Sequence, residues 1–224
     1  MRSGSDRSGC DGTGMEPTTT PLTTDPRPQF AAATETLRSV VAGVDPAQFD
    51  EPTACTEMDV RQLIDHLGMA VGRVTAAGHR RPLEEWPTEG DAVFDDAVAF
   101  IDGHIAEAVG AFDDDRLTEQ VQLPWTVMSG ADALAMYTNE VLVHTWDLAN
   151  ATGQDPVFDE GAVLAAEAVM RRELPLAERA LMWEEYAEAM PEGIPFVKPF
   201  DDAVPVPDDA TPIERLVAWN GRRP

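Results

Sequence analysis

Three ionisable side chains lie at helical spacing within one strongly apolar stretch, Met136–Leu148. With Met136 at zero and 100° per residue, Glu140, His144 and Asp147 fall at about 40°, 80° and 20°, on one face of a helix. The opposite face is also apolar, so no solvated face remains for the charges. A buried carboxylate or imidazole is costly unless it is paired or binds a metal ion. This stretch is therefore the sharpest functional signal in the sequence.

Glu140 and His144 are four residues apart, so both project from adjacent turns and could ligate one metal ion. A third ligand must come from another helix, and His66 is the best-placed candidate because it lies at the shoulder of an apolar stripe. Two imidazoles and one carboxylate suit Zn²⁺, Ni²⁺, Co²⁺ or Fe²⁺ and leave positions open for water or substrate. The same spacing also suits an ordinary ion pair or a core hydrogen bond, and the sequence leaves both interpretations open.

Three further polar side chains lie near these residues in sequence. Asp147 lies one turn after His144. It either accepts a hydrogen bond from the imidazole N–H that does not bind the metal, and so orients the ring, or serves as a solvated or capping acid. Tyr137 either donates a hydrogen bond to a substrate or is a core tyrosine. Cys55 precedes the helix of His66, where a helix N-terminus would stabilise a thiolate, but we favour a buried structural thiol. No catalytic or cofactor-binding residue can be assigned.

Composition limits the class of protein. The 224 residues are 43% hydrophobic, which suffices for one medium domain or for a domain with a smaller appendage. A net charge of −25 argues against a nucleic-acid or anionic-membrane partner. Cys10 and Cys55 make no disulfide framework, and the sequence shows no secretion signal or membrane span, so we expect a cytoplasmic protein with reduced thiols. Nucleotide-binding loops and the serine-hydrolase elbow are also missing from the sequence.

Apolar periodicity predicts an all-α protein. Residues 1–27 have the composition of a disordered tail, and the start could be Met1 or Met15. Residues 28–156 are expected to form an antiparallel four-helix bundle, and residues 157–224 a helical extension packed on it. The long helices are expected at about 29–44, 57–78, 91–112 and 130–152, shorter ones at about 159–172, 181–190 and 212–220, an extended stretch at 121–128 and irregular chain at 191–207.

Two segments resemble a known family. Thr53–Leu67 resembles the segment that opens the second helix of the mycothiol-dependent maleylpyruvate isomerase-like proteins, which belong to the wider DinB-like metal-binding helical bundles. Glu140–Ala149 is similar to the second signature of that family. The chain's ending, from Val204 to Arg222, is similar to that of one uncharacterised actinobacterial branch. The resemblance covers roughly residues 28–224.

The resemblance implies a four-helix bundle that binds a divalent metal, commonly zinc, through His66, Glu140 and His144. In characterised members mycothiol approaches the metal as nucleophile or cofactor, and a metal-bound thiol is deprotonated at neutral pH. The sequence departs from the family pattern at Met58, where Trp is usual, and at Ala54, where Pro is usual. Neither position is a ligand, and no motif identifies the substrate.

We therefore expect a metal-dependent transferase or isomerase that uses a small thiol, such as mycothiol, and an unidentified small substrate. The alternative is a non-catalytic metal-binding or stress-associated protein in which the metal is structural. The expected partners are small molecules, not nucleic acid or membrane, and a homodimer is left open.

Overall fold

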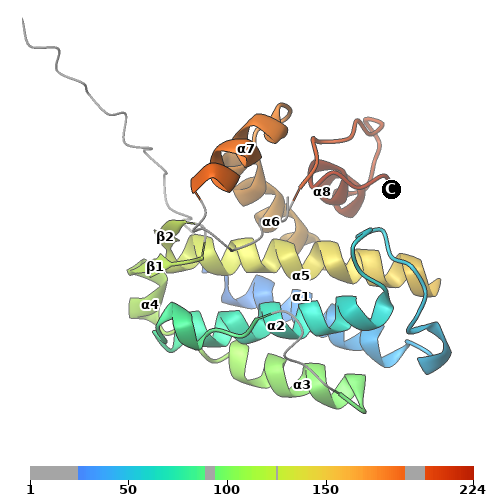
Figure 1. The fold of residues 1–224 in the computed structure, drawn as a ribbon, viewed down its shortest axis with the longest axis horizontal. Helices are drawn as coiled ribbons and strands as arrows, with labels where there is room; N and C mark the ends of the chain where they lie inside the picture. The colour runs from blue at the N-terminus through green and yellow to red at the C-terminus, as the bar shows by residue number, and fades with distance from the viewer. Residues whose placement is uncertain (1–24, 89–93, 125, 190–199) are drawn as a thin grey trace, which may run out of the picture.

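The computed structural model describes residues 25–88, 94–124, 126–189 and 200–224, and nearly all regular structure in them is helical (Figure 1). The bundle helices are α1 (Arg27–Ala42), α2 (Val60–Gly78), α3 (Ala97–Ala108) and α5 (Gly130–Thr152). Helices α1 and α2 each pack against α5, and α3 closes the bundle against α1 and α2. The predicted all-α fold with a DinB-like four-helix bundle is confirmed.

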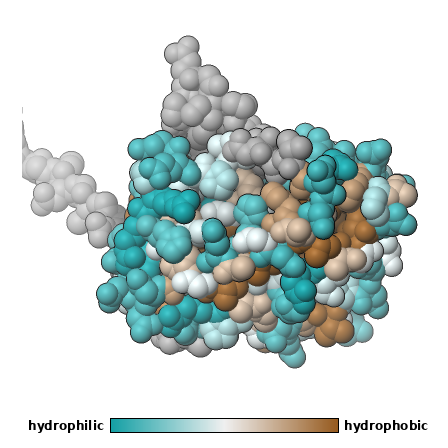
Figure 2. Space-filling view, turned by 90° about the horizontal axis from the view of Figure 1, so that it is seen from below, coloured by the Kyte–Doolittle hydropathy of each residue, from teal (hydrophilic) through white to brown (hydrophobic). Residues whose placement is uncertain are grey.

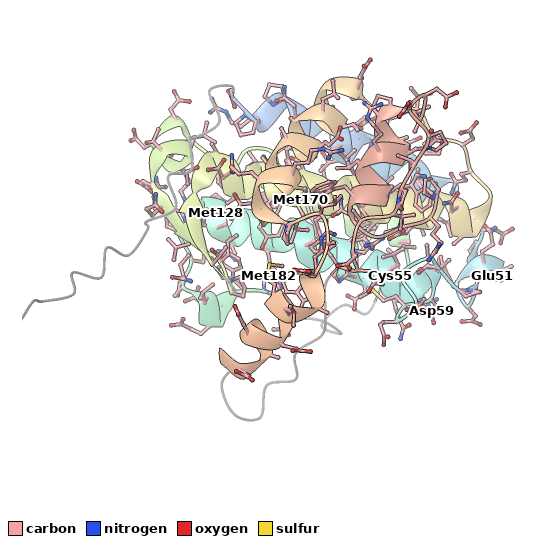
Figure 3. All side chains as sticks on the ribbon, turned by 90° about the horizontal axis from the view of Figure 1, so that it is seen from above. Glu51, Cys55, Asp59, Met128, Met170 and Met182 are labelled. Atoms are coloured by element: carbon pink, nitrogen blue, oxygen red, sulfur yellow. The ribbon has the colours of Figure 1, made fainter. Side chains whose placement is uncertain are left out.

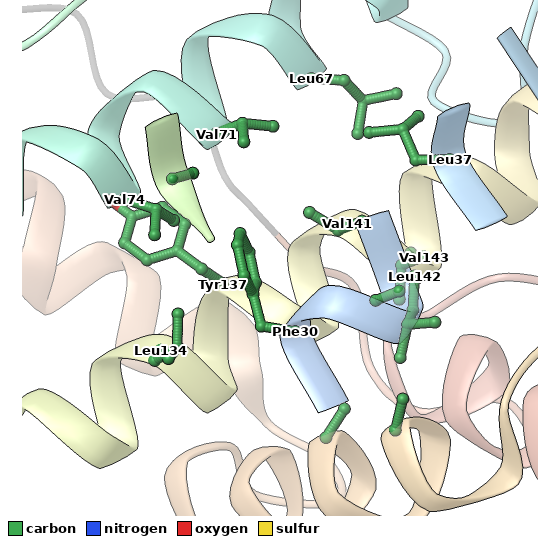
Figure 4. Close-up of a cluster of buried hydrophobic side chains, with 14 of the residues drawn as sticks. Phe30, Leu37, Leu67, Val71, Val74, Leu134, Tyr137, Val141, Leu142 and Val143 are labelled. Atoms are coloured by element: carbon green, nitrogen blue, oxygen red, sulfur yellow. The ribbon is translucent and has the colours of Figure 1, made fainter. Parts of the chain in front are cut away.

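The core lies between α1, α2 and α5, because each of these helices turns an apolar stripe inward. Figure 4 shows Phe30 of α1 beside Tyr137 of α5, with Val74 of α2 close to the same tyrosine ring. Helix α5 is buried on several faces, as its sequence predicted, since it packs against α1, α2 and the later helix α6 (Glu160–Glu173). Other buried members of this core are Leu37, Leu67, Val71, Leu134, Val141, Leu142 and Val143.

Helix α2 begins three residues later than predicted. The predicted start at residue 57 makes Thr56 the expected N-cap, but residues 55–57 lie in a bend and a turn before the helix. Asp59 is the cap instead: its side chain accepts from the backbone N–H of Gln62, and the Gln62 side chain accepts from the N–H of Asp59. This reciprocal capping box satisfies two backbone donors and fixes the helix start at Val60, six residues before His66.

Helix α5 has the bounds that the sequence predicted. Its N-cap, Ser129, accepts from the backbone N–H of Asp132, and its C-cap, Gly153, has a φ of 69°. That left-handed conformation carries little strain in glycine, which is why the helix ends there. Between the two caps, Glu140 and His144 are held on one continuous helical face.

The region between α3 and α5 differs from the prediction. Helix α3 is shorter than the predicted 91–112, because Asp96 caps its start and it ends at Ala108; residues 89–93 lie outside the described parts. A short α4 (Asp114–Thr118) follows. The predicted single extended stretch is a hairpin of β1 (Gln120–Gln122) and antiparallel β2 (Val127–Ser129), with Val121 opposite Met128. Two 3₁₀ turns, Pro46–Gln48 and Leu83–Glu85, lie in earlier connections.

Three helices follow the bundle: α6 (Glu160–Glu173), α7 (Arg179–Ala189) and α8 (Pro212–Trp219). Their bounds lie close to the predicted ones; residues 190–199, within or beside the predicted irregular stretch, are outside the described residues. Helix α6 packs on α5 and α1, and α8 packs on α6 and α5. The fully buried Arg179 donates to the carbonyl oxygens of Pro175, Asp201 and Trp219, so it ties α7 to the chain beside α8.

The face seen from below in Figure 2, on the side of α3, is largely hydrophilic, with hydrophobic residues gathered toward one end. Among the described residues, no helix is both long and apolar enough to cross a membrane.

A buried amide pair joins α5 to the residue that follows α8. Asn139 donates to Asn220 at 3.1 Å, and Asn220 donates back at 2.9 Å. Both side chains are almost completely buried. Each amide therefore satisfies polar atoms of the other that water cannot reach.

Replacing Asn220 with alanine is expected to lower the free energy of unfolding by about 1–3 kcal/mol, because Asn139 would keep buried polar atoms without their partner. Urea denaturation of both proteins measures the difference. The matched control is Asn150→Ala, at an exposed position of α5, which should change stability by less than about 0.5 kcal/mol. Equal stability of the wild type and Asn220→Ala would show that the pair contributes nothing.

Candidate metal centre

The three predicted ligands lie together between α2 and α5. Nε2 of His66 is 2.8 Å from Oε1 of Glu140, and Nε2 of His144 is 3.4 Å from the same oxygen. The two imidazole rings meet edge to face, with centroids 4.8 Å apart. One ligand atom from each residue lies within 4.8 Å of the other two. The amphipathic phases of two separate helices therefore bring the three donors to one point.

This donor set fits a divalent transition metal. Two imidazole nitrogens and a carboxylate oxygen form a known three-residue set for zinc sites with an open position. Ligand atoms about 2.0–2.2 Å from a tetrahedral zinc are themselves about 3.3–3.6 Å apart. The spacing of 3.4 Å between His144 and Glu140 lies in that range. The spacing of 2.8 Å between His66 and Glu140 is shorter by about 0.5 Å, so these two side chains would have to move apart to hold a zinc ion. Metal ligation itself remains a prediction.

The site is sheltered but reachable. The side chain of His144 is 7% exposed, while those of His66 and Glu140 are 13% and 24% exposed. The bundle core therefore covers the cluster on the side of His144, and solvent reaches it beside Glu140. An ion held there could accept a small ligand from that side.

Electrostatics couple Glu140 to both histidines. Burial alone would raise the pKa of Glu140, but the charge of His144 and hydrogen bonds with His144 and His66 hold the pKa well below its ordinary value. Burial would lower the pKa of His144, yet the charge of Glu140 and hydrogen bonds to Asp147 and Glu140 raise it overall. A proton and a metal ion would compete for Nε2 of His144, so acid should favour metal release.

Asp147 forms a hydrogen bond with Nδ1 of His144, the ring nitrogen that is not near Glu140. Its Oδ2 lies 2.9 Å from Nδ1 of His144, and the carboxylate is fully buried. Because an ionised carboxylate only accepts, this contact places a proton on Nδ1 and leaves Nε2 to face Glu140 and His66. Burial would raise the pKa of Asp147, but hydrogen bonds and the charges of His144 and Arg222 lower it overall. Asp147 is therefore a buried hydrogen-bond partner of His144 and not a solvated or capping acid.

The other residues considered from the sequence do not belong to the donor cluster of His66, Glu140 and His144. The Tyr137 side chain is 4% exposed and packs in the core of Figure 4, and burial raises the pKa of its hydroxyl. Cys55 is half-buried just before α2, near Asp59 in Figure 3, and burial raises the pKa of its thiol although the charge of Arg222 opposes this. Both observations favour structural roles. His79 is exposed, and half-buried His104 lies 2.8 Å from the carbonyl of Phe100.

One residue of the site was missed by sequence reasoning. Arg222, the third-last residue of the sequence, contacts both carboxylate oxygens of Asp147. No periodicity relates it to α5, which lies some seventy residues earlier. The only local signal is its place in the C-terminal segment that resembles the actinobacterial branch.

Comparisons with known proteins identify the family of this chain. The family model of the mycothiol maleylpyruvate isomerase N-terminal domain matches residues 30–149, just over half of the chain, and this range contains all three candidate ligands. An uncharacterised protein of Mycobacterium tuberculosis, found in strains CDC 1551 / Oshkosh and ATCC 25618 / H37Rv, is 29% identical over 201 residues, covering 88% of this chain and 98% of that protein. No solved structure matches significantly. The chain thus belongs to the family defined by the mycothiol maleylpyruvate isomerase N-terminal domain.

Proposed function

We propose that this protein binds a divalent metal through His66, Glu140 and His144 and acts with a small thiol of the mycothiol class as a transferase or isomerase. The observation that carries the proposal is the convergence of three donor atoms within 4.8 Å at a partly exposed point of an apolar bundle. Membership of the mycothiol maleylpyruvate isomerase N-terminal domain family supports the choice of thiol.

A bound divalent ion would supply Lewis acidity and would deprotonate a thiol ligand at neutral pH. Two neutral imidazoles and one carboxylate leave such an ion with net positive charge, which favours an anionic ligand. Asp147 accepts a hydrogen bond from the Nδ1 proton of His144, which would leave the Nε2 lone pair of His144 available to bind the ion. Glu140 lies on the exposed side, where the thiol and a second substrate would approach. Zinc fits this donor set best, and nickel, cobalt and iron accept the same donors.

A non-catalytic, structural metal is the second candidate. The donors come from two helices, α2 and α5, so an ion between them would also cross-link the bundle. Both candidates require the metal, but only the first requires a thiol to reach it.

The test is metal analysis followed by cobalt spectroscopy. Protein purified without a histidine tag is expected to carry about one divalent ion per chain. In the Co²⁺-substituted protein, mycothiol should change the visible spectrum through a new sulfur ligand, whereas S-methylated mycothiol should not. Full metal occupancy without any response to mycothiol would rule out the thiol-dependent enzyme and favour a structural metal. Absence of bound metal after reconstitution would exclude both candidates.

A further inference from the structure

The C-terminal segment contacts α5 at two buried points that flank the candidate ligands. Asn220 pairs with Asn139, the residue directly before Glu140. Arg222 pairs with Asp147, one turn beyond His144. The segment therefore holds the part of α5 that carries both ligands, although it lies about eighty residues later in the chain.

Arg222 engages Asp147 through two atoms. Its Nη2 donates to Oδ2 at 3.0 Å, and its Nε lies 3.4 Å from Oδ1. Oδ2 also accepts from Nδ1 of His144 at 2.9 Å. A fully buried carboxylate needs such partners, since it loses its hydration. One carboxylate thus joins the guanidinium at the chain's end to the imidazole of a candidate ligand.

A turn at the C-terminal end of α8 places Arg222 next to Asp147. Gly221 has a φ of 84°, in the left-handed region that favours glycine. Its N–H donates to the carbonyl oxygen of Ala218, and the N–H of Arg222 donates to that of Val217. These are the two hydrogen bonds of a Schellman motif. Nη1 of Arg222 also donates to the carbonyl oxygen of Asn220 at 2.9 Å. The position of the guanidinium is therefore restrained by hydrogen bonds within the C-terminal segment as well as by its contact with Asp147.

We propose that Arg222 is a positioning residue of the metal centre: it holds the Asp147 carboxylate in place, and Asp147 in turn fixes the imidazole of His144 with Nε2 toward the ion. This inference rests on the proposed metal binding. It adds that the imidazole of His144 is held in place only when the C-terminal segment, which lies outside the matched residues 30–149, is docked on α5.

The test is a double-mutant cycle in zinc affinity, measured by competition with a chromogenic chelator on the full chain. Arg222→Gln and Asp147→Asn are each expected to weaken zinc binding by about tenfold or more, as loss of a group that orients a ligand does. Because Arg222 acts through Asp147, adding Arg222→Gln to Asp147→Asn should weaken binding by no more than about twofold further. A purely structural arginine would give additive losses.

Two further variants complete the design. Arg223→Gln removes the same charge at the neighbouring exposed position and should bind zinc as the wild type does. Arg222→Lys keeps a positive charge near Asp147 and should recover part of the affinity, and it replaces Arg222→Gln in the cycle if that variant does not fold. Wild-type affinity in a folded Arg222→Gln protein, or additive losses, would overturn the inference while leaving the proposed metal site intact. A wild-type protein that binds no zinc would overturn both.

Discussion

Replacing His144 with alanine is expected to weaken zinc binding by more than about 100-fold and to leave the purified protein without stoichiometric metal. The expectation follows because loss of a group that merely orients a ligand costs 10–100-fold in affinity, so loss of the ligand itself should cost more. His144 is also the most buried donor of the three, so water cannot easily take its place. Elemental analysis and chelator competition measure the two effects.

A matched control is available on the same bundle. His104 lies on α3, half-buried, and does not belong to the donor cluster. His104→Ala should therefore retain about one metal per chain and near-native affinity. Full metal occupancy in folded His144→Ala would rule out the proposed trio, whereas equal loss in both variants would indicate general destabilisation.

The candidate ligands could be found from sequence because helical geometry fixes which residues share a face. Glu140 and His144 are four residues apart on a helix whose predicted bounds, about 130–152, were correct. His66 could be selected from its position beside the apolar stripe of a second amphipathic helix. Local patterns with a period of 3.6 residues therefore sufficed for these three side chains.

Arg222 and Asn220 could not be found in this way, because their contacts join segments about eighty residues apart and follow no period. The start of α2 was misplaced for a different reason. Thr56 and Asp59 are both acceptable N-caps, and only the reciprocal hydrogen bonds with Gln62 decide between them.

The hairpin was missed because its strands span three residues each, too few to reveal alternation. Tertiary pairing, not the local pattern, determines such elements.

Removing the metal is expected to lower thermal stability substantially. An ion that binds only the folded protein stabilises it by about 4 kcal/mol when its free concentration is 1,000 times the dissociation constant. For a chain of this size, 1 kcal/mol corresponds to about 2–4 °C in Tm. The zinc-saturated protein should therefore melt about 8–16 °C above the chelated protein. Differential scanning calorimetry with zinc or EDTA measures the shift.

The stabilisation should disappear when a ligand is removed, since a bound ion would stabilise the fold by joining α2 to α5 through these ligands. His144→Ala should melt at nearly the same temperature with zinc and with EDTA, while His104→Ala should keep the full shift. A shift of equal size in His144→Ala would place the stabilising ion elsewhere. No shift in the wild type would mean that zinc does not bind preferentially to the folded bundle. A large shift without any response of the cobalt form to mycothiol would make the ion a cross-link between α2 and α5, not a site of thiol chemistry.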